Sequence, residues 1–422
     1  MLDFQKLSAH YQQALLRQIV PFWLKHSRDE RCGGYFDLLT ATGEVIDGHK
    51  FVTQQAQQVW AFSWLYNTLD GQSGWLAHAR HGAAFLSQFA HDDKLTCHAQ
   101  LDRRGRPMIP SRDCVPDSFS LMAYAQFYRA TGDDEWAMLA KQLFTYLCQR
   151  WEIIRNEQAV IGSFQFIRHL SEPATFLKAL LELRPLVDEE VWKQTTDAVV
   201  QEIVHEFVDR RTDTLRECIL PGGAFVNTPE GRRLNVGLTF QTASYLLDFY
   251  QETASLKSSS AGAGSINRKA TVQIVAWCLQ LCEQAWDEAT CGLNQYVDMK
   301  RQPSIFTDWQ QKWAWVHVEA IASLVKGYVY TQHPDCLKWF KRIHDFTFGH
   351  FPDTQRMGWY LAIDQHAQPL LPAKSIPAAG CFSLVRCLTE TAQFLLKCER
   401  IQPTSQPSLL TITNSRSARQ TT

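Results

Sequence analysis

The sequence predicts an all-α fold in which the helices close into an α/α toroid. Apolar residues recur at steps of three and four along most of the 422-residue chain, which is the period of a helix with one buried face. Between alternate helical segments lie short stretches of strand-turn-strand character. A helix–hairpin–helix unit repeated along a chain is typical of a ring in which an inner circle of helices packs inside an outer circle. We expect the hairpins to gather at one end and to line a central pocket.

The helical period divides into about twelve segments. We expect helices over residues 4–23, 52–69, 75–89, 119–128, 136–151, 176–186, 191–207, 240–250, 272–286, 316–328, 336–351 and 382–396. Because the pattern runs through the whole body, we predict one domain over residues 1–400. Residues 255–267 are small and polar, which indicates a flexible loop. Residues 401–422 form a Ser/Thr-rich tail that we expect to be disordered.

Three segments have the character of hairpins, with an aromatic or β-branched run, a polar turn and a second short run. They cover residues 33–47, 95–108 and 358–371, and the shorter segment 291–298 resembles them. The glycines at 33 and 34 open a hairpin and do not connect a strand to a helix, so they are not a phosphate-binding loop.

The charge balance excludes several classes of partner. Lysine and arginine number 42 and aspartate and glutamate 43, a net charge of −1, which leaves no electrostatic footprint for nucleic acid or for an anionic membrane. No run of apolar residues reaches the ~18–20 residues of a membrane span. Polar residues interrupt the first 23 residues, so they lack the apolar core of a signal peptide. We expect a soluble, cytoplasmic protein.

The 12 cysteines are scattered and form no C-x-x-C pair. We interpret them as buried free thiols in a reducing compartment and expect no metal site and no cofactor. The 14 tryptophans are many for this length. Most should be core residues, but a minority that face the pocket would suit a sugar, because the C–H faces of a pyranose stack on aromatic rings.

Several segments resemble one known family. They are FWLKHSRDERCGGYFDLLTATGEVIDGHKF and QQVWAFSWLYN near the start, GRRLNVGLTFQTASYLL from Gly231, KWAWVHVEAIASLVKGY from Lys312 and AAGCFSLVRCL from Ala378. They are similar, in order and spacing, to the N-acylglucosamine 2-epimerase family, which includes cellobiose 2-epimerases, mannose isomerases and mannose 2-epimerases. The resemblance runs to about residue 400 and implies an (α/α)6 barrel with a central sugar pocket.

The resemblance also implies a chemistry. In this family the sugar ring opens, a base removes the proton at C2, and a second group returns a proton to the enediolate. Two histidines suit these roles because their pKa lies near neutral pH. An arginine and glutamates orient the hydroxyls and stabilise the enediolate.

Both histidines are absent from the matching positions. In a pattern like N-P-G-H-x-x-E-x-x-W the histidine falls at Leu238 and the glutamate at Gln241. In a pattern like K-G-C-F-H-x-P-R the histidine falls at Ser383. The arginine of a W-x-Q-x-R pattern falls at Gln57. Loss of a positioned acid or base typically costs ~10²–10⁴-fold in rate, so we expect a pseudo-epimerase that binds a saccharide without converting it.

Other positions agree with the family. Lys50, Trp60 and Lys312 match, although Ala314 replaces the first of two paired tryptophans. Because the replacements make the pocket less charged and wider, a neutral mono- or disaccharide is the expected ligand. The residues expected to bind it are Gln55, Gln57, Glu217, Asn235, Gln241, Trp315, Glu319, Ser383 and Arg386.

Alternatives stay open at this point. The protein could be a working sugar epimerase or isomerase with relocated catalysts, for which His317 and His98 are the candidates and His169 a weaker one. Hydrolysis by a carboxylate pair would draw on Asp117, Glu217, Asp308 or Glu319, but no spacing pairs them. A protein partner, with the barrel as sensor or scaffold, and a homodimer are also open.

Overall fold

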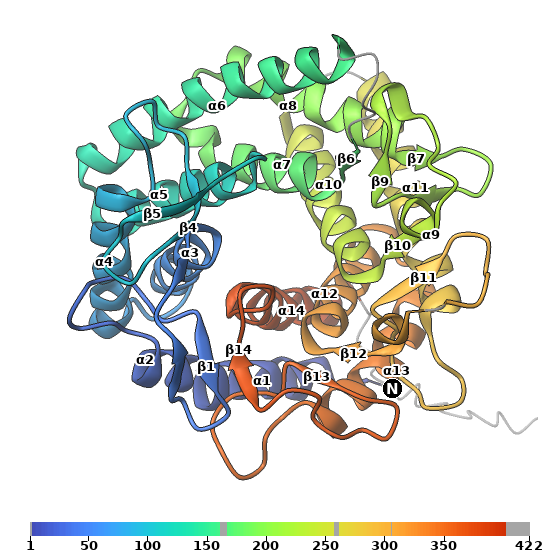
Figure 1. The fold of residues 1–422 in the computed structure, drawn as a ribbon. Helices are drawn as coiled ribbons and strands as arrows, with labels where there is room; N and C mark the ends of the chain where they lie inside the picture. Colours follow the sequence, from blue (N-terminus) through green and yellow to red (C-terminus); the bar gives the residue numbers. More distant parts are fainter. Residues whose placement is uncertain (1, 161–166, 257–260, 305, 402–422) are drawn as a thin grey trace, which may run out of the picture.

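The computed structural model describes residues 2–160, 167–256, 261–304 and 306–401 and shows a ring of helices (Figure 1). Within these residues, twelve long helical segments form two concentric circles. The predicted all-α toroid is therefore confirmed. Residues 402–422, the greater part of the predicted tail, lie outside the described residues. No described helix combines the length and the apolar character needed to cross a bilayer.

The inner circle consists of every second helix. Each inner helix contacts the next, and the last contacts the first, so the ring is closed. The inner helices are α3 (Val52–Thr68), α5 (Val115–Thr131), α7 (Ser171–Leu183), α10 (Val236–Leu256), α12 (Ala314–Thr331) and α14 (Phe382–Ile401).

The outer circle covers the inner one, and large apolar side chains such as Trp60, Trp192 and Trp359 fill the space within the barrel wall. Leu15–Ile19 form a π-helical turn just before Pro21, whose ring would clash with the carbonyl four residues earlier in a regular helix. The outer segments are α1 (Phe4–Ala14) with η1 (Leu15–Ile19) and α2 (Val20–His26), α4 (Ser73–Phe89), α6 (Asp134–Val160), α8 (Glu189–Glu202) with η3 (Ile203–Phe207), α11 (Ala261–Ala285) and α13 (Pro334–His350).

The flexible loop predicted over residues 255–267 is wrong at both ends, and residues 257–260 lie outside the described residues. Helix α10 continues to Leu256, and helix α11 already begins at Ala261. The sequence AGAGS at its start has no large apolar residues, so the helical period could not reveal it. Short elements complete the chain: η2 (Arg184–Leu186), η4 (Pro221–Gly223), α9 (Pro229–Arg232) and η5 (Thr307–Gln310).

The first two predicted hairpins are confirmed. Strands β1 (Leu38–Thr40) and β2 (Val45–Asp47) pair antiparallel, as do β4 (His98–Leu101) and β5 (Pro107–Pro110). The other two segments pair mainly with neighbouring units: β13 (Ala362–Ile363) joins β12 (Lys312–Trp313), and β11 (Tyr296–Asp298) joins β10 (Arg233–Asn235). The remaining pairings are β14 (Ala373–Ser375) with β1, β3 (Lys50–Phe51) with β4, β6 (Arg168–His169) with β9 (Cys218–Ile219), and β7 (Val208–Asp209) with β8 (Thr214–Leu215).

An aspartate turn recurs where outer segments end. In each case the Asp side chain accepts backbone N–H groups from residues two to four positions later, as in an Asx turn. The aspartates are Asp29, Asp92, Asp209, Asp287 and Asp353. The turn sends the chain back across the end of the ring towards the next inner helix.

Three of these aspartates also hold a buried lysine. The distance from the lysine Nζ to the aspartate Oδ2 is 3.3 Å for Lys50 and Asp29, 2.9 Å for Lys312 and Asp287, and 2.8 Å for Lys374 and Asp353. The lysines come from the strands that precede α3, α12 and α14. We call these aspartate turns, with their lysines, the turn layer.

Candidate functional site

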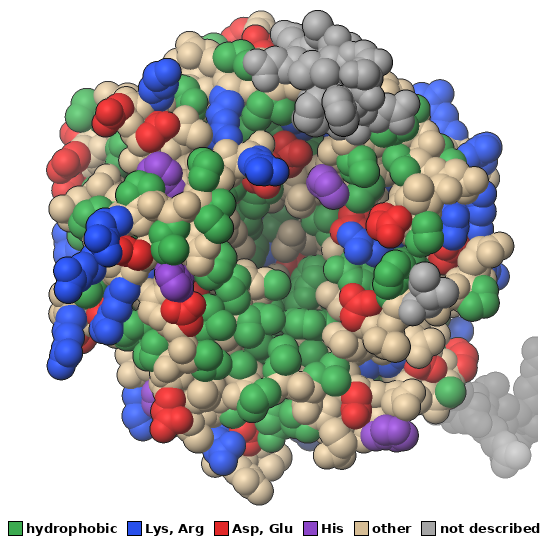
Figure 2. Space-filling view, in the orientation of Figure 1, with side chains coloured by type: hydrophobic (Ala, Val, Ile, Leu, Met, Phe, Trp, Pro, Cys, Tyr) green, Lys and Arg blue, Asp and Glu red, His purple; other side chains and the backbone are tan. Residues whose placement is uncertain are grey.

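A cavity of about 740 Å³, including its mouth, opens at the hairpin end of the ring. Figure 2 shows the hollow at the centre of this face, with mainly hydrophobic and uncharged side chains reaching into it. The lining residues from the inner helices are Thr53, Gln54, Gln57, Val115, Phe119, Ser171, Thr175, Leu238, Gln241, Trp315, Phe382 and Ser383, and the loop 377–380 closes one side.

The lining is built from the first two turns of the six inner helices. Strands β3, β6, β10 and β12 lead almost directly into α3, α7, α10 and α12, so the helix N-termini lie at the hairpin end. Residues one turn apart share a helix face, and Thr53 with Gln57, or Ser171 with Thr175, have this spacing. Sequence reasoning missed most of these residues, although the opening turns of alternate helices would have marked them.

The cavity lining is uncharged. Among the described residues that line it, none carries a titratable side chain; amides, hydroxyls, aromatic rings and aliphatic groups make up the surface. The free space inside the cavity is about 220 Å³, somewhat below the roughly 300–1,000 Å³ of typical small-molecule pockets. This surface can form hydrogen bonds and stack on a ring, but it offers no group to carry a proton.

Charged residues lie directly beneath the floor. Glu319 is fully buried, and its Oε1 accepts hydrogen bonds from Gln241 Nε2 at 2.8 Å and Ser383 Oγ at 2.7 Å. Arg386 donates to the other oxygen of Glu319 and also to Glu390, at 2.8 Å. Burial favours a raised pKa of Glu390, but Arg386 and Lys326 outweigh it and lower the pKa to about 2. The floor therefore rests on a buried ionic network.

The structure brings most of the expected site residues together. Gln57, Leu238, Gln241, Trp315 and Ser383 line the cavity, as the resemblance implied. Glu319 and Arg386 instead support it from below, because both are fully buried.

Two expected residues, Asn235 and Glu217, lie outside the cavity lining. Asn235 caps α10 by accepting the Leu238 N–H at 3.1 Å, and its Nδ2 donates to Glu217 at 3.2 Å. Glu217 also pairs with Arg233 at 2.6 Å. These contacts hold the start of α10, and therefore Leu238, in place.

The expectation for Gln55 requires correction. Its Nε2 donates to the Tyr35 carbonyl at 2.9 Å and to Asp37 at 2.8 Å, and its Oε1 accepts the Tyr35 N–H at 2.8 Å. Gln55 is therefore fully engaged with the hairpin segment. The neighbouring residue, Gln54, lines the cavity instead.

The candidate relocated histidines are not part of the cavity lining. His317 is fully buried; its Nε2 accepts the Leu293 N–H at 2.9 Å, and its Nδ1 lies 2.7 Å from the Trp313 carbonyl. Burial lowers the pKa of His317 to about 3. His98 lies on β4, paired with β5, and His169 lies 3.3 Å from Cys218 Sγ across the β6–β9 pair.

The carboxylates considered for hydrolysis do not meet in the cavity. Asp117 is buried against Arg150 at 2.6 Å, and Asp308 is exposed on η5. Within the described part of the chain, no three or more His, Cys, Asp or Glu side chains are grouped to hold a metal ion. The arrangement therefore offers binding groups rather than an acid/base pair.

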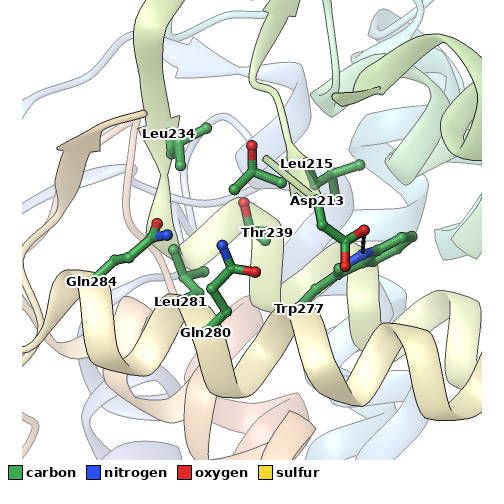
Figure 3. A pocket seen from close by; sticks show the side chains of 9 residues that line it. Asp213, Leu215, Leu234, Thr239, Trp277, Gln280, Leu281 and Gln284 are labelled. Carbon is green, nitrogen blue, oxygen red and sulfur yellow. Dashed lines mark hydrogen bonds between the residues drawn. The ribbon is translucent and has the colours of Figure 1, made fainter. Parts of the chain in front are cut away.

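A second, much smaller pocket lies between α10 and α11 (Figure 3). It encloses about 240 Å³, and Trp277 Nε1 donates to Asp213 at 2.8 Å on its wall. Thr239 from α10 and Gln280 from α11 also line it. Its free space, about 10 Å³, is too small for a saccharide. We take the central cavity as the candidate site because the opening turns of all six inner helices meet there.

Comparisons with known proteins agree with this fold. The family model described as N-acylglucosamine 2-epimerase (GlcNAc 2-epimerase) matches residues 34–380. The N-acylglucosamine 2-epimerase of Mus musculus is 27% identical over 401 residues, 92% of each chain.

Solved structures show the same architecture. The cellobiose 2-epimerase of Bacillus thermoamylovorans B4167 superposes with a TM-score of 0.78 at 19% identity, covering 92% of this chain and 99% of that one. A D-mannose isomerase superposes with a TM-score of 0.76 at 16% identity, covering 92% and 97%. The predicted (α/α)6 barrel is confirmed, and because the family model spans most of the sequence, the chain belongs to the N-acylglucosamine 2-epimerase family.

Proposed function

We propose that this protein is a carbohydrate-binding barrel without the acid/base chemistry of its family, a pseudo-epimerase. One observation carries the proposal: none of the described side chains that line the cavity can take up or release a proton near neutral pH. The family resemblance implies histidines at positions 238 and 383, and the residues at these positions, Leu238 and Ser383, line the cavity. A general base must lie within hydrogen-bond reach of the proton that it removes, and the lining supplies none.

The chemistry of the lining supports a sugar as the ligand. Trp315, Phe119 and Phe382 offer aromatic surface, and glutamine and threonine side chains offer hydrogen bonds. Relatives and structural neighbours are named for acting on N-acylglucosamine, cellobiose and mannose. A neutral mono- or disaccharide is the ligand class that fits this surface.

Proton exchange at C2 tests the absence of catalysis. The purified protein is incubated in heavy water with mannose, glucose, N-acetylmannosamine, fructose or cellobiose, and the sugar protons are followed by NMR. We expect no exchange above that of heat-denatured protein. Exchange would overturn the proposal in favour of the alternative, a working epimerase or isomerase, and His98→Asn and His169→Asn would then identify the base.

Ligand-induced stabilisation tests the binding. We expect at least one of these sugars to raise the Tm of the wild type. Trp315→Ala should weaken the binding of that sugar on the order of tenfold, because an aromatic contact face is lost. Gln12→Ala, at an exposed glutamine on α1, is the control and should bind as the wild type does. If no sugar stabilises the protein, or if Trp315→Ala binds unchanged, the central cavity is not the sugar site.

A further inference from the structure

Buried Glu319 controls the direction of the hydrogen bonds at the cavity floor. Three donors converge on its two oxygens: Gln241 Nε2, Ser383 Oγ and a guanidinium nitrogen of Arg386. An ionised carboxylate only accepts hydrogen bonds, whereas a protonated one must also donate. The guanidinium is permanently charged, so this geometry requires an acceptor-only carboxylate at position 319.

The two floor residues must therefore turn their donors away from the cavity. Ser383 has a single hydroxyl proton, and it is used on Glu319. Gln241 turns its amide nitrogen to Glu319, and its carbonyl Oε1 has no partner in the described chain. Both residues present acceptor oxygens to a ligand.

Two residues of the cavity wall follow the same pattern. Thr175 donates its hydroxyl proton to the Ser171 carbonyl at 2.7 Å. Gln54 donates from Nε2 to the Pro377 carbonyl at 2.7 Å, and its Oε1 packs against Gly380. The side chains of other wall residues make no hydrogen bond within the described residues and can donate to a ligand: Gln57, Thr53, Ser171 and the indole N–H of Trp315.

We propose, on the basis of the proposed sugar-binding function, that Glu319 makes the floor a surface of acceptors that selects ligands by their hydroxyl protons. The ligand class is a neutral polyol, and sugars with a carboxylate or phosphate at the contacting position are rejected. An anionic oxygen placed against Ser383 and Gln241 would be desolvated without a donor, which costs more than leaving a neutral group unpaired. Glu319 is a positioning residue that does not touch the ligand.

The helix N-termini around the cavity act in the opposite sense. Each carries a partial positive charge and favours an anion placed within the first turn. Several of these termini are already capped, since Asn235 accepts the Leu238 N–H and Asp113 accepts the Val115 N–H at 2.9 Å. The Phe51 N–H, at the start of α3, is taken by Asp37 at 2.6 Å. The acceptors at the floor touch the ligand directly, so they decide the selectivity.

The first experiment measures the preference for neutral ligands. Dissociation constants are determined for glucose against glucuronate and glucose 6-phosphate, and for N-acetylmannosamine against N-acetylmannosamine 6-phosphate. We expect the neutral member to bind at least tenfold more tightly in each pair that shows binding. In Glu319→Gln the carbonyl faces Arg386 and the amide nitrogen faces the floor, so Ser383 and Gln241 must reverse and the preference should shrink.

The outcomes of this experiment are distinct. Equal or tighter binding of the anionic sugars by the wild type overturns this inference and leaves sugar binding intact. An unchanged preference in Glu319→Gln shows that Glu319 does not control it. If neither member of any pair binds, the proposed function fails, and the inference fails with it.

The second experiment needs no ligand. Gln241→Glu places a second carboxylate 2.8 Å from the acceptor oxygen of Glu319, and like charges at this distance raise the pKa of the introduced group. Because that pKa is raised in the folded state, stability is lost as pH rises. We expect the Tm to fall by a few degrees relative to the wild type at pH 8 and by less at pH 5. Gln57→Glu is the matched control and should cause the smaller loss at pH 8; equal losses would contradict the assigned hydrogen-bond direction.

Discussion

The turn layer and the cavity lining lie at the same end of the ring, yet they use opposite kinds of side chain. The turn layer contains buried ion pairs such as Lys374 with Asp353, in which each side chain is 1% exposed. The cavity lining has no charged side chain among the described residues. The scaffold around the cavity is thus ionic, and the surface that faces a ligand is polar but neutral.

This difference shows that the fold and the chemistry of a barrel are separable. A buried ion pair is difficult to lose one partner at a time, because the remaining charge is then unpaired in a low-dielectric site. A lining residue such as Leu238 has no such constraint: it packs at the start of α10, and a change at this position leaves no charge unpaired. The scaffold can therefore persist when the lining residues change.

The largest effect is expected from breaking the turn layer. Lys374→Met removes the cation that holds Asp353 and leaves its carboxylate buried and unpaired. We expect a loss of about 3–5 kcal/mol in the free energy of unfolding, the usual cost of breaking a buried pair, measured by urea denaturation. The control is Arg106→Gln, in a pair with Asp102 whose arginine side chain is 78% exposed, where little change is expected. Similar effects of the two substitutions would mean that the turn layer does not depend on its ion pairs.

A gain of chemistry in the cavity is the next largest expected effect. Leu238→His combined with Ser383→His, with and without Gln57→Arg, restores the groups that the family resemblance implies. A well-placed acid or base contributes typically ~10²–10⁴-fold. Because the surrounding residues are not adapted to these histidines, we expect C2 proton exchange on the order of only tenfold above the wild-type background.

Leu238→Phe combined with Ser383→Asn is the matched control, because it changes the volume without adding a titratable group. It should show no exchange. If the histidine variant still binds sugar but exchanges no proton, the identity of residues 238 and 383 does not by itself explain the absence of catalysis.

The helices and the family could be predicted from the sequence because both depend on local signals. The helical period of α12 and α14 is visible in single segments, and so is the motif around Gly380. The partner of a strand depends on units far along the chain, so the pairing of β13 with β12 was missed.

The cavity lining shows the same limit. Gln54 and Gln55 are adjacent in sequence, and only the rotation of α3 within the ring decides that Gln54 faces the cavity and Gln55 the hairpin. His317 was a reasonable candidate base by composition. The Leu293 N–H that occupies its Nε2 comes from a turn 24 residues away, which no local pattern reveals.

The last prediction concerns Asp37, which lies where the turn layer meets the first turn of α3. Its carboxylate accepts the Phe51 N–H at 2.6 Å and Gln55 Nε2 at 2.8 Å, but it has no hydrogen-bonded cation within the described residues. Burial raises the pKa of Asp37 to about 8, against the lowering effect of these two donors and of Lys50. It therefore differs from Asp29 of the turn layer, where Arg103 and Lys50 outweigh the effect of burial and lower the pKa to about 2.

The raised pKa has a definite sign in the dependence of stability on pH. Between about pH 4 and 8 the folded protein keeps the Asp37 proton, whereas the unfolded chain releases it, so stability falls as pH rises through this window. Asp37→Asn removes this contribution, and the wild type should lose stability relative to the variant from pH 5 to 8 and level off above. In the control, Asp102→Asn, the profile should change only below about pH 4, because the Arg106 N–H lowers the pKa of that carboxyl. A wild-type advantage that stays constant from pH 5 to 9 would mean that Asp37 is ionised, as the paired aspartates of the turn layer are.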